Sequence, residues 1–286
     1  MTGPPVRLTA PAAAVAPRLP SWVTLVRAPN PGPMTLDGTN TWVLRAAPGA
    51  PATVVDPGPL DEGHVAAVLA TGPVAHVLLT HAHADHRAGL PAFLARSGAA
   101  LVVPAADPGA QPDPGAPGAR AARADGTGDR VRYRLDGIDV EVRDTPGHTA
   151  DSRCFVLSCA GERVVATGDT ILGRGTTVVA WPDGHLGDYL DSLAALAAYP
   201  GVPALTGHGP ALADTAAAAA HYTAHRRARL AQVRAAVAAG ADTPEAVVDA
   251  VYADVPPLLR TAATWSARAQ LDHLAAAPAP PPEPAP

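Results

Sequence analysis

The residues best suited to chemistry are imidazoles and carboxylates in the run His81-Ala82-His83-Ala84-Asp85-His86. Three further side chains of the same kinds stand apart at His148, Asp169 and His208. Each of these four groups follows a stretch of apolar residues that reads as a strand. Side chains at the carboxyl edge of a packed sheet converge on one cleft. We therefore expect all four groups to meet in a single site.

The residue types in this pattern favour a metal centre. Neutral imidazole is a good zinc ligand, and carboxylate oxygens also bind the ion. His81 and His83, just past a strand end, place both rings on one side, whereas Asp85 and His86 turn the other way as a helix begins. The pattern can therefore serve two adjacent metal ions.

These motifs, together with Val55-Asp56-Pro57-Gly58 upstream, resemble the metallo-β-lactamase superfamily in order and spacing. The resemblance implies an α+β fold, a four-layer αββα sandwich. Carried over residue by residue, it implies a first metal held by His81, His83 and His148, a second held by Asp85, His86 and His208, and Asp169 bridging both. The resemblance also implies that Asp56 lies next to the metal ligands, without binding the metal itself, and helps to orient them.

Residues 30–41, 168–177 and 207–210 narrow the resemblance to the β-lactamase-like protein 2 group, over residues 22–275. In that group the C-terminal helices form a small winged-helix-like domain. Animal members are endoribonucleases acting on single-stranded RNA, and fungal relatives release polyketides from a carrier-protein thioester. A Pro/Gly-rich insert at residues 104–128 departs from the group's pattern.

The function implied is that of a dinuclear hydrolase. Two zinc ions per chain, or other divalent metals, would hold a bridging hydroxide that attacks an ester, thioester or similar small acyl substrate. Asp85 and Asp169 are the expected catalytic residues, which orient the nucleophile and accept its proton. Alternatives are a single-strand-specific endoribonuclease, a glyoxalase-II-like thioesterase, and a nucleic-acid-binding module with an idle metal domain. The partner is accordingly a small molecule or single-stranded RNA.

Strands and helices that must position these residues alternate along the chain up to about residue 212, after which the chain is helical. Strands are expected at 22–27, 41–45, 53–55, 74–79, 101–103, 131–135, 138–143, 153–157 and 163–166; helices at 60–70, 86–96, 189–199, 214–239, 243–252 and 256–276. Four regions follow: a disordered Ala/Pro-rich arm at 1–20, a catalytic domain at 21–212, a winged-helix-like domain at 213–277 and a disordered tail at 278–286.

Composition limits the alternatives. The chain has 286 residues, a net charge of −5 and no lysine, which argues against broad binding to nucleic acid or anionic membrane. No secretory signal and no apolar run of about 20 residues is present, so we expect a cytoplasmic protein without a membrane partner. Cys154 and Cys159 would lie on opposite sides of one strand, and we expect free thiols. The histidines outside the motifs are interpreted as solvated or structural.

Overall fold

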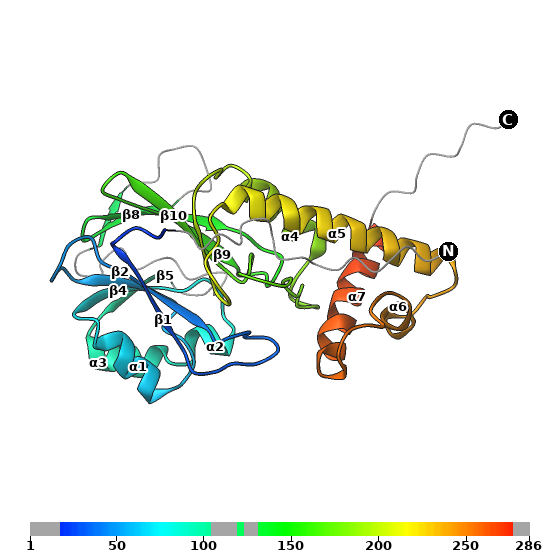
Figure 1. Ribbon diagram of the computed structural model, residues 1–286, viewed down its shortest axis with the longest axis horizontal. Helices are drawn as coiled ribbons and strands as arrows, with labels where there is room; N and C mark the ends of the chain where they lie inside the picture. Colours follow the sequence, from blue (N-terminus) through cyan, green and yellow to red (C-terminus); the bar gives the residue numbers. More distant parts are fainter. Residues whose placement is uncertain (1–17, 104–118, 123–130, 277–286) are drawn as a thin grey trace.

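The computed structural model describes residues 18–103, 119–122 and 131–276. Figure 1 shows two stacked sheets with helices on their outer sides, and a helical region at one end. Residues 1–17 of the predicted N-terminal arm, the C-terminal tail and most of the insert at residues 104–128 lie outside the described residues.

The first sheet contains β1 to β5 in sequence order, with β1 to β3 antiparallel and β3, β4 and β5 mutually parallel. Its strands are β1 (Val23–Arg27), β2 (Asn40–Leu44), β3 (Ala52–Val55), β4 (Val74–Leu78) and β5 (Ala100–Val103). Because β3 and β4 are parallel, Asp56 after one strand and His81 just beyond the other come to the same edge. The helices of this half are α1 (Glu62–Leu69), α2 (Ala84–Arg87) and α3 (Leu90–Ser97).

The second sheet has the order β11-β10-β9-β8-β7-β6 among the described residues. Its strands are β6 (Ala119–Ala122), β7 (Arg132–Leu135), β8 (Ile138–Asp144), β9 (Arg153–Cys159), β10 (Glu162–Gly168) and β11 (Ala204–Thr206). Both β8 and β10 pair antiparallel with β9, and β11 is parallel to β10, so β8, β10 and β11 end at one edge. His148, Asp169 and His208 follow these three ends.

Apolar side chains between the sheets form the central core. Trp42 and Leu78 of the first sheet belong to the same buried cluster as Phe155 and Leu157 of the second. Each such side chain contributes roughly 1.5–3 kcal/mol when fully buried. Separate clusters join the first sheet to α1 and α3, and the second sheet to α4 (Leu186–Leu196) and α5 (Thr215–Ala238). The predicted αββα sandwich is confirmed.

The C-terminal region is helical, as expected. Asp214 caps the start of the long helix α5, since its carboxylate accepts from Ala217 N at 2.9 Å, and Gly240, with φ +100°, follows the helix end. Figure 1 shows α5 running from the sandwich into the small domain formed with α6 (Pro244–Val251), the turn Pro257–Leu259 and α7 (Arg260–Ala276). The domain boundary at residues 212/213 stays a prediction.

Two predicted elements were wrong in detail. The single helix expected at 86–96 is two helices, α2 and α3, separated at Gly89. A Cβ on Gly89 would lie 2.6 Å from the carbonyl oxygen of Pro59. The position between the two helices therefore requires glycine, because the backbone of Pro59 packs directly against it. The Pro/Gly-rich insert at residues 104–128, for which no strand was predicted, contains β6, which pairs antiparallel with β7.

Cys154 and Cys159 are buried free thiols on β9. Within the described residues, no helix has the length and apolarity needed to span a bilayer.

Candidate metal centre

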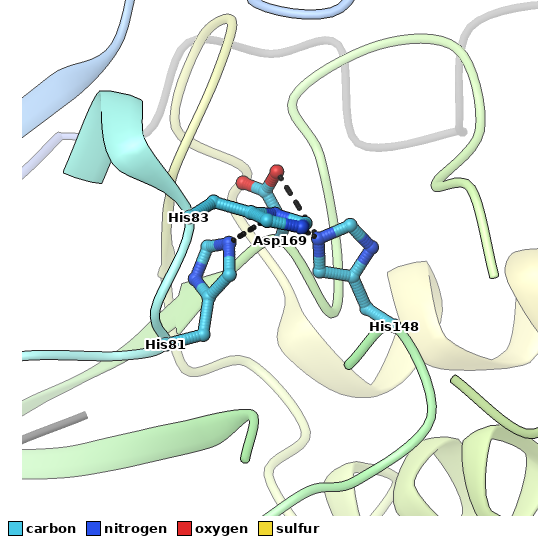
Figure 2. A group of neighbouring side chains, drawn as sticks. All are labelled: His81, His83, His148 and Asp169. Carbon is cyan, nitrogen blue, oxygen red and sulfur yellow. Dashed lines mark hydrogen bonds and ion pairs between the residues drawn. The ribbon is translucent and has the colours of Figure 1, made fainter. Parts of the chain in front are cut away.

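The seven predicted ligand residues come together at the shared edge of the two sheets. They form two groups, and within each group the ligand atoms lie within 4.8 Å of one another. Figure 2 shows three imidazoles and one carboxylate of the first group converging from separate segments of the chain. The first group is His81, His83, His148 and Asp169, and the second is Asp85, His86 and His208.

Nitrogen atoms in the first group are spaced like donors around one ion. His83 Nδ1 lies 2.9 Å from His81 Nε2 and 3.0 Å from His148 Nε2. Donors around a tetrahedral zinc ion with bonds of 2.0–2.1 Å are about 3.3 Å apart. A small adjustment would therefore place one zinc-sized ion in contact with all three imidazoles.

The second group has the same spacing. Asp85 Oδ2 lies 3.3 Å from His86 Nε2 and 3.2 Å from His208 Nε2, and the two imidazole nitrogens are 3.3 Å apart. These three atoms can contact one ion without rearrangement.

Asp169 lies between the two groups. Its Oδ2 is 3.7 Å from His148 Nε2 in the first group and 3.3 Å from His208 Nε2 in the second. Its Oδ1 is 3.5 Å from His86 Nε2, is buried and has no hydrogen-bond partner. A buried carboxylate oxygen without a partner is costly. The donor set therefore fits two cations that share the Asp169 carboxylate.

Electrostatics favour the metal-binding forms of His81, His148 and the two carboxylates, whereas His208 holds a proton that a metal ion would have to displace. Burial lowers the pKa of His81 and of His148, which keeps both imidazoles neutral. Burial also opposes ionisation of Asp85 and Asp169, but the surrounding imidazoles outweigh it and hold both carboxyl pKa values well below their usual range. In return, Asp169 and its neighbours overcome burial at His208 and raise its pKa to about 9.

Asp56 fixes the orientation of His86. It follows β3 with φ +54°, and its carboxylate accepts from Thr80 N at 2.8 Å, from Thr80 Oγ1 at 2.7 Å and from His86 Nδ1 at 2.9 Å. A proton on Nδ1 leaves the Nε2 lone pair directed at the second group. The predicted supporting position of Asp56 thus has a geometric basis.

Residues 30–41 support the second group, a role that sequence reasoning missed. Thr39 Oγ1 donates to Asp85 Oδ2 at 3.0 Å, and Asn30 holds Thr39 by accepting from its backbone N at 2.8 Å. Asn40 Nδ2 donates to the carbonyls of Thr206 and Gly209, on either side of His208. The resemblance marked this segment, but no local pattern indicates which of its side chains reach across the fold.

Helix α5 holds the loop that orients the first group. His148 Nδ1 donates to the carbonyl of Val178 at 2.6 Å, and Thr177 Oγ1 donates to the carbonyl of Asp169 at 2.5 Å. From α5, Arg226 donates to the Thr177 carbonyl, and Tyr222 Oη bonds to both backbone groups of Leu172. The C-terminal region therefore contributes to the geometry of the metal centre.

An interdomain cavity of 310 Å³ adjoins His148 and Asp169. Its walls are mostly apolar: Leu172 and Val178 belong to the sandwich, whereas Leu259 and Ala262 belong to the helical domain. Its volume is at the lower end of the range for small-molecule sites. The arrangement can hold a compact ligand next to both metal groups.

Comparison with known proteins agrees with this geometry. Residues 34–208 match the metallo-beta-lactamase superfamily, and residues 243–277 match the beta-lactamase associated winged helix domain. The beta-lactamase-like protein 2 homolog of Caenorhabditis elegans is 31% identical over 264 residues, which cover 90% of this chain and 85% of that protein. The atrochrysone carboxyl ACP thioesterase of Aspergillus chevalieri is 32% identical over 255 residues, which cover 84% and 76%.

Solved structures show the same fold. A beta-lactamase domain protein from Burkholderia ambifaria superposes with a TM-score of 0.70 at 24% identity, covering 93% of this chain and 89% of that one. A metallo-beta-lactamase family protein from Thermus thermophilus gives a TM-score of 0.66 at 23% identity, covering 89% and 93%. The chain therefore belongs to the metallo-β-lactamase superfamily of metal-dependent hydrolases and carries the associated C-terminal winged-helix domain.

Proposed function

We propose that this chain is a dinuclear zinc hydrolase that cleaves a thioester or ester of a small acyl group. The observation that carries the proposal is the position of Asp169, which lies between both ligand groups and lines the interdomain cavity. His81, His83 and His148 would hold one ion, Asp85, His86 and His208 would hold the other, and Asp169 would serve both. When bound, the ions supply Lewis acidity and lower the pKa of water towards neutrality.

The two carboxylates are the proposed catalytic residues. Asp85 is kept in one orientation by the hydrogen bond from Thr39, and Asp169 by its place between the imidazoles. Both are ionised at neutral pH because the pKa of each is held low. They can therefore accept a proton from the attacking water and orient it towards the substrate's carbonyl carbon.

The cavity supports an acyl substrate over RNA. Sites for single-stranded nucleic acid combine a long cationic groove with several stacking aromatic side chains. Here the cavity is compact and largely apolar, and Tyr252 is the aromatic residue in its described lining. The thioesterase named among the relatives supports a thioester as the scissile group.

The test uses metal-free protein, prepared with a chelator and then reloaded with zinc, cobalt or manganese. Each form is assayed on an acyl thioester, a simple ester, a lactone and single-stranded RNA. We expect zinc-dependent thioester or ester hydrolysis that is absent from the His83→Ala variant. Cleavage of RNA alone, or no acyl hydrolysis by protein carrying two zinc ions, would contradict the proposal.

A further inference from the structure

Two arginines of α5 line the interdomain cavity. Arg226 and Arg229 are three residues apart, so they lie on one side of the helix. Arg226 is buried, with 5% of its surface exposed, and His225 beside it is 7% exposed. Positive charge without a paired carboxylate is thus concentrated on the α5 side of the cavity; its opposite walls carry Asp169, and Arg174 paired with Asp37, among mostly apolar residues.

Each guanidinium is only partly satisfied by the protein. Arg226 donates to Thr176 Oγ1 and the Thr177 carbonyl, and lies 5.2 Å from the ring centre of Tyr189. Arg229 donates to the carbonyl of Val251 at 2.6 Å. The Nε atoms of both arginines are buried and have no hydrogen-bond partner.

No carboxylate neutralises this pair within the described parts of the chain. The arginines that form ion pairs there are others, such as Arg132, Arg174 and Arg260. His225 adds no charge, because burial and the two arginines lower its pKa to about 4. Buried charge is costly unless it is paired, and neutral carbonyls and rings offset only part of that cost.

We propose that Arg226 and Arg229 form a subsite for an oxyanion of the substrate. This inference rests on the proposed function. Guanidinium groups match carboxylate and phosphate in shape and hydrogen-bond geometry. The anion is either a carboxylate at the far end of the acyl group or a phosphate in the thiol leaving group. The cavity volume of 310 Å³ corresponds to about ten groups the size of a water molecule, at roughly 30 Å³ each. This size suits a short acyl chain ending in a carboxylate.

The experiment compares three thioesters on zinc-loaded protein. Hexanoyl-N-acetylcysteamine is neutral, its adipoyl counterpart adds a carboxylate to the acyl end, and hexanoyl-4′-phosphopantetheine adds a phosphate to the thiol. We expect kcat/KM for one of the two anionic substrates to exceed that for the neutral one by about ten- to a hundred-fold, as typical of a charge-assisted hydrogen bond. Which of them gains identifies the source of the anion.

Variants of α5 connect this preference to the arginine pair. Arg229→Met should bring the ratio of kcat/KM for the anionic substrate to that for the neutral one close to one. Arg229→Lys keeps the positive charge but lacks the paired N–H donors of a guanidinium, so it should give an intermediate ratio. Arg229 is preferred to Arg226 because Arg226 also holds the loop of Thr177. Arg227 is exposed on the same helix, so Arg227→Met is the matched control and should keep the wild-type ratio.

The outcomes separate the two proposals. Equal kcat/KM for all three thioesters in the wild type would overturn the subsite while leaving the hydrolase function intact. An anion preference that survives in Arg229→Met would overturn it as well. If thermal melting shows that Arg229→Met is unfolded, Arg229→Lys takes its place. An anionic-to-neutral ratio in Arg229→Lys equal to that of the wild type would then overturn the subsite. Failure to hydrolyse any of the three would contradict the proposed function itself.

Discussion

Replacement of Asp56 by asparagine should weaken the second metal group without altering its ligands. In the wild type, Asp56 Oδ2 accepts from Thr80 Oγ1 and from His86 Nδ1, while Oδ1 accepts from Thr80 N. An asparagine that keeps the bond to Thr80 N presents an NH₂ group at the Oδ2 position. The Thr80 hydroxyl can rotate to accept from it, but His86 Nδ1 can no longer donate.

The consequence is a change of tautomer at His86. To bond with the amide, Nδ1 must accept, so the ring proton moves to Nε2, the atom that lies 3.3 Å from Asp85 Oδ2 and from His208 Nε2. A protonated Nε2 cannot bind a metal ion. Loss of such a supporting partner typically costs 10- to 100-fold in metal affinity, or about 1.4–2.8 kcal/mol.

Zinc titration of metal-free protein, in competition with a chelator of known affinity, measures this effect. For Asp56→Asn we expect the dissociation constant of one zinc ion to rise by about 10- to 100-fold while that of the other changes far less. Asp139→Asn is the matched control, because Asp139 is exposed and pairs with Arg134, away from the candidate metal centre. If Asp56→Asn folds normally and binds both ions with wild-type affinity, the tautomer argument is refuted.

Three further predictions concern the first group and α5. His83→Ala should abolish turnover while circular dichroism and thermal melting of the metal-free protein stay close to wild type; surviving activity would contradict the role of His83. Arg226→Met leaves the Thr177 carbonyl without its donor and should lower the free energy of unfolding in urea by about 1–3 kcal/mol, with weaker zinc binding at the first group; no change in either would show that α5 does not hold the loop. His225 has its pKa lowered to about 4 in the folded chain, so between pH 6.5 and pH 4 the unfolded chain binds a proton that the folded chain does not. Wild-type stability should therefore fall more steeply than that of His225→Gln over this range, and parallel curves would contradict this.

The convergence of the candidate ligand residues was predictable because its signals are local. His148, Asp169 and His208 each follow a short apolar strand, and parallel strand directions then bring the three ends to one edge. The caps at Asp214 and Thr243 were equally readable, since a side-chain oxygen accepts from a backbone N three residues later.

Features that depend on distant contacts were not predictable. Arg226 contacts the carbonyl of Thr177, 49 residues away, and the ring of Tyr189, and no local pattern indicates either partner. The break at Gly89 results from contact with Pro59, which no helix periodicity reveals. The interdomain cavity is lined by the loop after Asp169, by α5 and by the helices that follow it, so its lining could not be read from the chain.

The central claim is that seven side chains form two adjacent cation sites sharing Asp169. Native mass spectrometry of metal-free protein titrated with zinc tests it most directly. We predict saturation at two zinc ions per chain, with His208→Ala retaining one tightly bound ion. Saturation of the wild-type protein at a single ion, or no binding at micromolar zinc, would contradict the claim.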